Sequence, residues 1–463
     1  MKKYTAYKLV FLPVILFTLQ SCFSAKNYIR PEVVDETNYR TDQLPQDSLT
    51  IATVSWRELF TNANLESYIE EGLQNNIDIR IALQQIDAAK AYFKQGKSSQ
   101  YPDLNVGAQA AHQQLSDNGQ SGGGSFTQYD LSGTLSWEAD IWGKIRSNRR
   151  AFKASYLQSV AAHKAVKTEL IANIASVYFQ LLALDEQLMI TEESIANRES
   201  SLETTKALKD AGFVTEVGVK QTEAQLYTAQ SLQIDLRMNI QLLENTMSIL
   251  LGESPHEIER SSLSQQGVDV ELDTGYPVQL LHNRPDVIAA EYNLINAFEL
   301  TNVARSNFYP SLNISAAAGL QSLDFDNLLS INSLFSNVIG SLTQPVFNGR
   351  RIRTQYEVAQ SEEEVAYLNF RRAILNGSRE VSDALYSYEA AEEKIEVETL
   401  EYEAYEAATL YSEELLNNGL INYLEVLTAR ENALNSQLDL INARFDRLNS
   451  VVELYRALGG GWQ

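Results

Sequence analysis

Two hydrophobic patterns alternate along the chain and predict helices followed by pairs of strands. From Leu65, apolar residues recur at intervals of three to five, which is the spacing of an amphipathic helix. This helix is predicted to end at Tyr101-Pro102, because a residue that precedes proline avoids the α region. Residues 104–110 and 129–137 then alternate apolar and polar side chains, as half-buried strands do.

The same arrangement recurs further along the chain. Strand patterns reappear at residues 312–320 and 334–346. Residues 73–110 match residues 281–318 at twelve of 38 positions, where ordinary composition would give roughly two or three. With small shifts, Leu135 falls on Leu342, Gly143 on Gly349 and Gly212 on Gly419. The chain is therefore predicted to consist of two copies of one structural unit.

Very long helices are predicted after each strand pair. Residues 144–211 contain neither glycine nor proline, and a helix of this length would extend about 100 Å. Gly212 marks a turn before a second helix at residues 219–251. Copy two repeats this with residues 350–418, which are free of proline but contain Gly377, then a turn at Gly419 and residues 420–458. A rod-like coiled coil is the alternative, although strict heptads are not sustained and a rod needs no strand pairs.

The four predicted strands are too few to form a closed membrane β-barrel by themselves. Each copy offers two strands of roughly the length that a tilted transmembrane strand needs, about 9–11 residues. Four strands cannot close a barrel, and lipid tolerates no open sheet edge, whereas three copies would supply twelve strands. Phe126, Tyr129 and Trp137 would suit an aromatic belt at the membrane surface. The soluble alternative is a small sheet of two hairpins packed on the helices.

The N-terminus has the pattern of a secretory signal. Lysines precede an apolar run, residues 9–19, which is too short to span a bilayer. Leu19-Gln20-Ser21-Cys22 then resembles the lipobox of bacterial lipoproteins, in which the cysteine is diacylated and becomes the N-terminus. Phe23 stands where an aspartate would favour inner-membrane retention, so the outer membrane is expected. The alternative is a plain signal peptide with an incidental Cys22.

Composition excludes several classes of function. The net charge is −23, from 37 basic and 60 acidic residues, which disfavours nucleic acid as a partner. A single cysteine excludes disulfides within the chain. No nucleophile–base set or phosphate-binding loop stands out, so neither an enzyme nor a cofactor is expected. The four histidines have no metal-ligand spacing: His112, His163, His256 and His282.

Several motifs resemble those of one family. They are Arg284-Pro285-Asp286-Val287, Tyr309-Pro310, Pro345-Val346-Phe347 with Gly349, and the C-terminal Ala457-Leu458-Gly459-Gly460-Gly461-Trp462. Together they resemble the outer-membrane efflux proteins of the TolC type, and specifically the NodT-like lipoprotein branch.

The resemblance implies a mixed α and β fold and a homotrimer. Four strands per chain would contribute to a twelve-stranded β-barrel in the outer membrane of a Gram-negative bacterium, and the long helices would form a barrel in the periplasm. The channel would export drugs and other toxic small molecules delivered by an inner-membrane pump through a periplasmic adaptor. Two alternatives stay open, namely a periplasmic coiled-coil lipoprotein scaffold without a pore and a type I protein secretion conduit.

Within this family pattern, individual residues acquire expected roles. Pro102 and Pro310 would fix bends between helix and strand, and Gly143 and Gly349 would permit tight turns between strand and helix. The turns at Gly212 and Gly419 would form the periplasmic tip. Matching to the family makes Leu424 a candidate for an apolar constriction, with Glu425 and Thr428 at positions where relatives often have acidic residues. The alternative is that Leu424 serves helix packing and Glu425 lies on a solvated face.

Arg284 and Asp286 are expected to form a structural ion pair.

The predicted organisation of the whole chain is a lipoprotein signal peptide at 1–21, an extended tail at 22–64, a first repeat at 65–255, a linker at 256–280 and a second repeat at 281–463.

Overall fold

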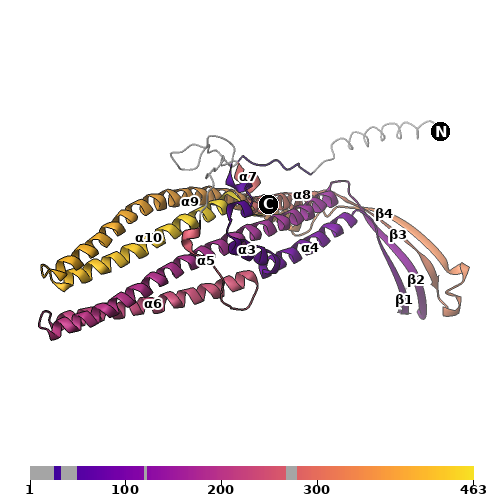
Figure 1. The fold of residues 1–463 in the computed structure, drawn as a ribbon. Helices are drawn as coiled ribbons and strands as arrows, with labels where there is room; N and C mark the ends of the chain where they lie inside the picture. Colours follow the sequence, from indigo (N-terminus) through magenta and orange to yellow (C-terminus); the bar gives the residue numbers. More distant parts are fainter. Residues whose placement is uncertain (1–24, 33–49, 119–122, 267–278, 463) are drawn as a thin grey trace. The chain divides into compact units, whose positions relative to one another are not determined.

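A computed structural model describes residues 25–32, 50–118, 123–266 and 279–462 (Figure 1). Cys22 and the predicted signal peptide lie outside these residues. The chain divides into two compact units, and each takes segments from both copies of the repeat. The first consists of Met1–Pro31, Ile86–Ser159 and Ala290–Phe370; the second consists of Glu32–Gln85, Val160–Ala289 and Arg371–Gln463.

The first unit contains one antiparallel sheet built from both copies. Its order is β1-β2-β3-β4, so β2 of copy one pairs with β3 of copy two. The predicted hairpins are therefore joined in a single four-stranded sheet (Figure 1). The strands are β1 (Asp103–Leu115), β2 (Gly124–Ala139), β3 (Ser311–Ser322) and β4 (Leu334–Thr343). β4 is shorter than predicted and ends before Pro345, whose nitrogen cannot donate to a strand partner.

The two hairpins share one register. Leu104 lies opposite Leu135 in copy one, and Leu312 lies opposite Leu342 in copy two. These pairs correspond when the first strand is shifted by 208 residues and the second by 207. The match between Leu135 and Leu342 that the sequence indicates is thus confirmed by strand pairing.

The predicted first helix is interrupted. The structure has α3 (Ala63–Asn75) and α4 (Ile77–Ser98) instead of one helix from Leu65 to Tyr101. Asn76 lies between them, and its side-chain oxygen accepts hydrogen bonds from the backbone N–H groups of Asp78 and Ile79 at 2.8 and 3.2 Å. An asparagine that caps a new helix ends the preceding one, and the apolar spacing alone does not reveal this.

The expected extended tail is partly helical where the structure describes it. η1 (Ile51–Thr53) and α2 (Trp56–Leu59) precede α3. The side chains of Thr50 and Ser55 cap these turns, and Trp56 is buried in the core of the second unit. Four residues are too few to show helical periodicity in a sequence, which explains the difference.

Copy two repeats the break at the same position. α7 (Leu280–Asn283) and α8 (Pro285–Ser306) flank Arg284, which stands 208 residues after Asn76. Asn76 donates from its side-chain amide to the carbonyl of Leu250 at 2.9 Å, and Arg284 donates to the carbonyl of Ala457 at 2.7 Å. Both side chains thus anchor a helix break to the end of a long helix.

The long helices have equal lengths in the two copies. α5 (Lys144–Asp210) and α9 (Arg351–Asn417) have 67 residues each, and α6 (Glu216–Leu251) and α10 (Tyr423–Leu458) have 36 each. A constant shift of 207 residues therefore relates them. With this shift Gly143 corresponds to Arg350, and Gly143, Gly349 and Arg350 all have positive φ, 79°, 61° and 68°. The pairing of Gly143 with Gly349 expected from the sequence is one residue out of register.

The buried Arg284 is the centre of an ion network in the second unit. Its guanidinium contacts Asp286 at 2.7 Å, as expected, and also Glu380 at 2.8 Å. A side chain at Gly377 would bring its Cβ to 3.2 Å from Cδ of Arg284. The glycine inside α9 thus makes room for the arginine, which accounts for its presence in a long helix.

No helix among the described residues has the length and hydrophobicity needed to cross a membrane. The remaining elements are short 3-10 turns: η2 (Leu263–Gln265), η4 (Phe325–Asn327) and η5 (Ile331–Ser333).

Candidate functional site: the turns between the paired long helices

The two turns that link the long helices have the same backbone geometry. Gly212 and Gly419 adopt φ values of 81° and 73°, the left-handed conformation that glycine enters without steric cost. Each glycine N–H bonds to a carbonyl three residues earlier, and the next N–H bonds to one five residues earlier. This pattern is the Schellman motif, which ends a helix and starts the return.

An apolar side chain follows the glycine in each turn. Phe213 is 80 % exposed and Leu420 is 70 % exposed, and they are related by the 207-residue shift. The sequence analysis did not identify either residue. The available signal was the recurrence of a large apolar residue directly after the helix-ending glycine in both copies.

The three candidate gate residues lie on one exposed face of the first turns of α10. The side chain of Asn422 caps this helix by accepting from the N–H of Leu424 at 2.8 Å. Leu424 is half exposed, and Glu425 and Thr428 are exposed. The neighbouring side chains on the opposite face are buried: Tyr423, Val426 and Leu427.

The corresponding turn of α6 is held by an ion pair. Lys209, near the end of α5, lies 2.8 Å from Glu216 in the first turn of α6. The hydrogen bond from Lys209 lowers the pKa of the Glu216 carboxyl. Val217, which corresponds to Leu424, is 65 % exposed. Both tips therefore present an apolar side chain at the same position.

Two arginines behind the tips join the helical hairpins. The buried Arg198 on α5 contacts Glu431 on α10 at 2.8 Å and donates to the carbonyl of Gln225 on α6. Arg430 on α10 contacts Glu413 on α9 at 2.6 Å and donates to the hydroxyl of Ser201 on α5. Together, these two side chains connect all four long helices. Sequence reasoning missed both, because each occupies an ordinary position in an amphipathic helix.

A groove of about 450 Å³ lies beside these arginines, between α5, α9 and α10. Arg198 and Arg430 line it together with three carboxylates, Glu193, Glu406 and Glu413. Charged side chains thus line this groove, and apolar side chains are exposed at the turns themselves.

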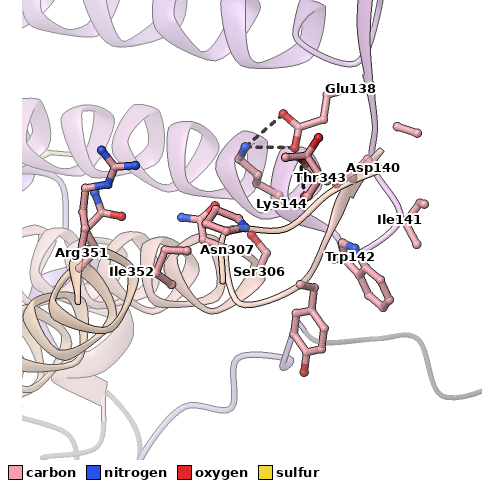
Figure 2. A pocket seen from close by; sticks show the side chains of 15 residues that line it. Glu138, Asp140, Ile141, Trp142, Lys144, Ser306, Asn307, Thr343, Arg351 and Ile352 are labelled. Atoms are coloured by element: carbon pink, nitrogen blue, oxygen red, sulfur yellow. Dashed lines mark hydrogen bonds and ion pairs between the residues drawn. The ribbon is translucent and has the colours of Figure 1, made fainter. Parts of the chain in front are cut away.

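A second hollow lies where strands meet helices in the first unit. It measures about 350 Å³, and Figure 2 shows side chains of Glu138, Asp140, Lys144 and Arg351 around it. Lys144 donates to Glu138 at 3.0 Å. Asp140 caps α5, since its oxygens accept from the backbone N–H groups of Ile145 and Arg146.

Tryptophans hold the bends at both predicted prolines. Trp142 stacks on Tyr309 with ring centroids 4.8 Å apart, and its indole N–H donates to the carbonyl of Pro310 at 2.7 Å. The indole N–H of Trp137 donates to the carbonyl of Gln100, two residues before Pro102. Each bend between helix and strand is thus fixed by an indole hydrogen bond to a backbone carbonyl.

Within the described part of the chain, no three His, Cys, Asp or Glu side chains gather in an arrangement that could hold a metal ion. The acylation site expected at Cys22 lies outside that part.

The sequence of this chain is similar to those of known outer-membrane proteins. The profile of the family "Outer membrane efflux protein" matches residues 68–253 and 276–460. The solvent efflux pump outer membrane protein SrpC of Pseudomonas putida is 28 % identical over 456 residues, covering 96 % of this chain and 97 % of the relative. The cation efflux system protein CusC of Escherichia coli K12 is 25 % identical, covering 96 % and 98 %. The probable outer membrane lipoprotein SilC of Salmonella typhimurium is 26 % identical, covering 98 % and 99 %.

Solved structures show the same fold. A membrane protein from Pseudomonas aeruginosa superposes with a TM-score of 0.88 at 24 % identity, covering 95 % of this chain and 98 % of that one. The outer-membrane channel OprN gives a TM-score of 0.88 at 23 % identity, covering 95 % and 99 %.

The paired long helices and the four-stranded sheet thus define a TolC-like channel fold of mixed α and β structure. The chain belongs to the outer membrane efflux protein family. Its family, fold class, efflux function and outer-membrane location are those predicted from the sequence motifs.

Proposed function

We propose that three copies of this protein form the outer-membrane exit channel of a tripartite efflux system. An inner-membrane pump and a periplasmic adaptor would deliver drugs or other toxic small molecules to it, and the channel would conduct them without a chemical step. The observation that supports this most is the sheet, which ends at β1 and β4 and so offers two edges for other copies. Relatives named for efflux of solvents and of cations support the substrate class.

The direct test is reconstitution. The purified protein is expected to be a trimer and to form pores of one size in planar lipid bilayers. A monodisperse monomer without conductance would contradict the proposal and would favour a coiled-coil scaffold.

We also propose that Cys22 is diacylated and anchors the chain. The relative named as a probable lipoprotein supports this. So does the segment that follows Cys22, which is fixed to α8: Arg30 contacts Glu291 at 2.6 Å, and the backbone of Lys26 exchanges hydrogen bonds with Asn302. Short docked tails of this kind hold an anchor in a defined place relative to the fold.

The proposed gate is the exposed face of α10 formed by Leu424, Glu425 and Thr428. Leu424→Ala is expected to widen the constriction, because it removes an exposed apolar side chain from the helix end. Single-channel conductance should rise, and large antibiotics should enter cells more easily. The matched control is Val217→Ala, the same position in copy one, which should change conductance less. Equal effects would show that both copies form the constriction, and no effect would place the constriction elsewhere.

A further inference from the structure

Three lysines form an exposed row on α4, at the end of the helix that leads into the sheet. Lys90, Lys94 and Lys97 recur with helical spacing, so they share one side of the helix. All three residues are exposed. Lys97 lies over the ring of Phe93, 4.5 Å from its centroid. No ion pair among the described residues involves this lysine row, although Asp87 precedes Lys90 by about one helical turn.

Copy two has a covered face at the same positions. With the 208-residue shift, Lys90 corresponds to Phe298 and Lys94 to Asn302 on α8. The N-terminal segment covers this face: the rings of Tyr28 and Phe298 have centroids 5.7 Å apart, and Asn302 exchanges two hydrogen bonds of 3.0 Å with the backbone of the same segment. Asn302 is 2 % exposed. The corresponding face of α4 is open and has lysines in place of the aromatic ring and the amide.

The N-terminal segment also relates this face to the proposed lipid anchor. Ala25 lies beside Gly143 at the junction of β2 and α5, since a Cβ added to Gly143 would be 3.4 Å from that of Ala25. Ala25 is the third residue after Cys22, so the chain between them can extend at most about 11 Å. Acyl chains on Cys22 would therefore hold the membrane surface close to the helix ends, and Lys97 is the last residue but one of α4.

The distribution of basic residues agrees with this position of the membrane surface. Neither lysine nor arginine occurs between Lys97 and Lys144, or between Arg305 and Arg350, the stretches that form the strands and their connections. Exposed aromatic side chains stand at the helix–strand junctions, including Tyr101 at 67 %. Aromatic residues at the membrane surface with basic residues just outside it are typical of proteins that cross a bilayer.

We propose that the lysine row binds the phosphate groups of anionic phospholipids, in the leaflet of the outer membrane that faces the periplasm. A lysine ammonium group offers three hydrogen-bond donors and a full positive charge, which suit phosphate oxygens. Lys90 lies about 12 Å from the end of α4, and the attraction between exposed charges extends about 8–10 Å in salt. This inference rests on the proposed channel, because it requires the sheet to lie in the membrane.

Another copy of the N-terminal segment does not suit the lysine row. That segment contains Lys26 and Arg30, which the row would repel. Arg30 is held on α8 by Glu291 at 2.6 Å, and the 208-residue shift places Leu83 at the corresponding position of α4. Copy one therefore lacks the carboxylate that fixes the segment, and its added cations favour a ligand rich in negative charge.

Brominated lipids test this contact, because bromine quenches tryptophan fluorescence at short range. Trp137 is a local reporter, since its indole donates to the carbonyl of Gln100, three residues after Lys97. The full-length protein is placed in phosphatidylcholine bilayers with a rising fraction of brominated phosphatidylglycerol. It should prefer phosphatidylglycerol at least about fivefold, the effect of roughly one lysine at an anionic surface. At about 0.5 M salt the preference should fall, because exposed charges are screened.

The triple variant K90Q, K94Q and K97Q should bind both lipids about equally. The matched control is K206Q, K220Q and K394Q, which removes the same charge from exposed positions of the second unit and should keep the preference. A triple variant that still prefers phosphatidylglycerol would overturn the inference. So would lysine-dependent binding to purified peptidoglycan without a lipid preference, which would assign the lysine row to the cell wall.

Bilayer recordings on the same proteins separate this inference from the proposed function. Triple-variant trimers that conduct normally but bind both lipids equally would support both the lipid contact and the channel. Conducting trimers of the starting protein without a preference would overturn the lipid contact and leave the channel intact. A protein that forms no pores but prefers phosphatidylglycerol through the lysine row would overturn the channel and support the lipid contact alone.

Discussion

Replacing both tip arginines, Arg198→Ala with Arg430→Ala, is expected to open the channel that we propose. The side chain of Arg198 is only 6 % exposed, and its contact with Glu431 joins α5 to α10. Hydrogen bonds to charged groups contribute about 1.5–3 kcal/mol each. A net loss of about 2–3 kcal/mol from the arrangement that these contacts hold would shift its equilibrium with one that lacks them roughly 30- to 150-fold. Single-channel recordings should show a higher conductance and a larger open fraction.

The control for this experiment is Lys206→Ala. Lys206 contacts Glu203 on the same helix, α5, with both side chains exposed, so the pair joins no two helices. Surface pairs of this kind contribute little, and conductance should stay at its original value. If the arginine variant also conducts as the original does, these ion pairs do not control the width of the proposed channel.

Gly459→Ala is expected to unfold or strongly destabilise the second unit. Gly459 ends α10 with φ at 89°, and a Cβ there would lie 2.5 Å from the carbonyl oxygen of Asn283. The left-handed conformation costs a residue with a Cβ about 1–2 kcal/mol, and the clash with backbone adds about 1–3 kcal/mol. The free energy of unfolding, measured by guanidinium titration in detergent, should fall by the sum of the two.

Gly419→Ala separates these two causes. Gly419 has a similar φ of 73° at the end of α9, but a Cβ there would meet nothing within 4 Å. The Gly419→Ala substitution should lower the free energy of unfolding only by the cost of the left-handed backbone conformation, about 1–2 kcal/mol. Similar losses for both variants would mean that the carbonyl of Asn283 moves away from the new side chain.

Gly252 shows that the close approach at Gly459 belongs to the repeat. It ends α6, and a Cβ there would lie 2.6 Å from the carbonyl oxygen of Asn75. Asn75 and Asn283 are among the residues that the two copies share. A glycine is needed at both places because the backbone of the helix break touches the end of a long helix.

The sequence predicts the long helices well because it contains their physical limits. The absence of glycine and proline over residues 144–211, with Gly212 directly after, places α5 within one residue of its observed end. Strand alternation likewise finds all four strands. Both patterns depend only on neighbouring residues, so the helices and strands that they predict are present in the folded chain.

Features that depend on distant contacts were not predictable in this way. Asn76 caps α4 locally, but its side-chain amide also donates to the carbonyl of Leu250, which is 174 residues away. Arg198 and Glu431 are 233 residues apart. The family motifs supply the class of protein, whereas these pairs follow only from the three-dimensional arrangement of the helices.

The equal lengths of the long helices have an evolutionary consequence. From α4 to β1 the copies differ by 208 positions and from β2 to α10 by 207, so their single length difference falls between the two strands of a hairpin. An insertion within α5 would shift every contact with α10 unless α9 changed equally. The helix lengths of one copy therefore constrain those of the other. Insertions and deletions that persist during divergence should accumulate in the strand-connecting loops, where no counterpart has to match them.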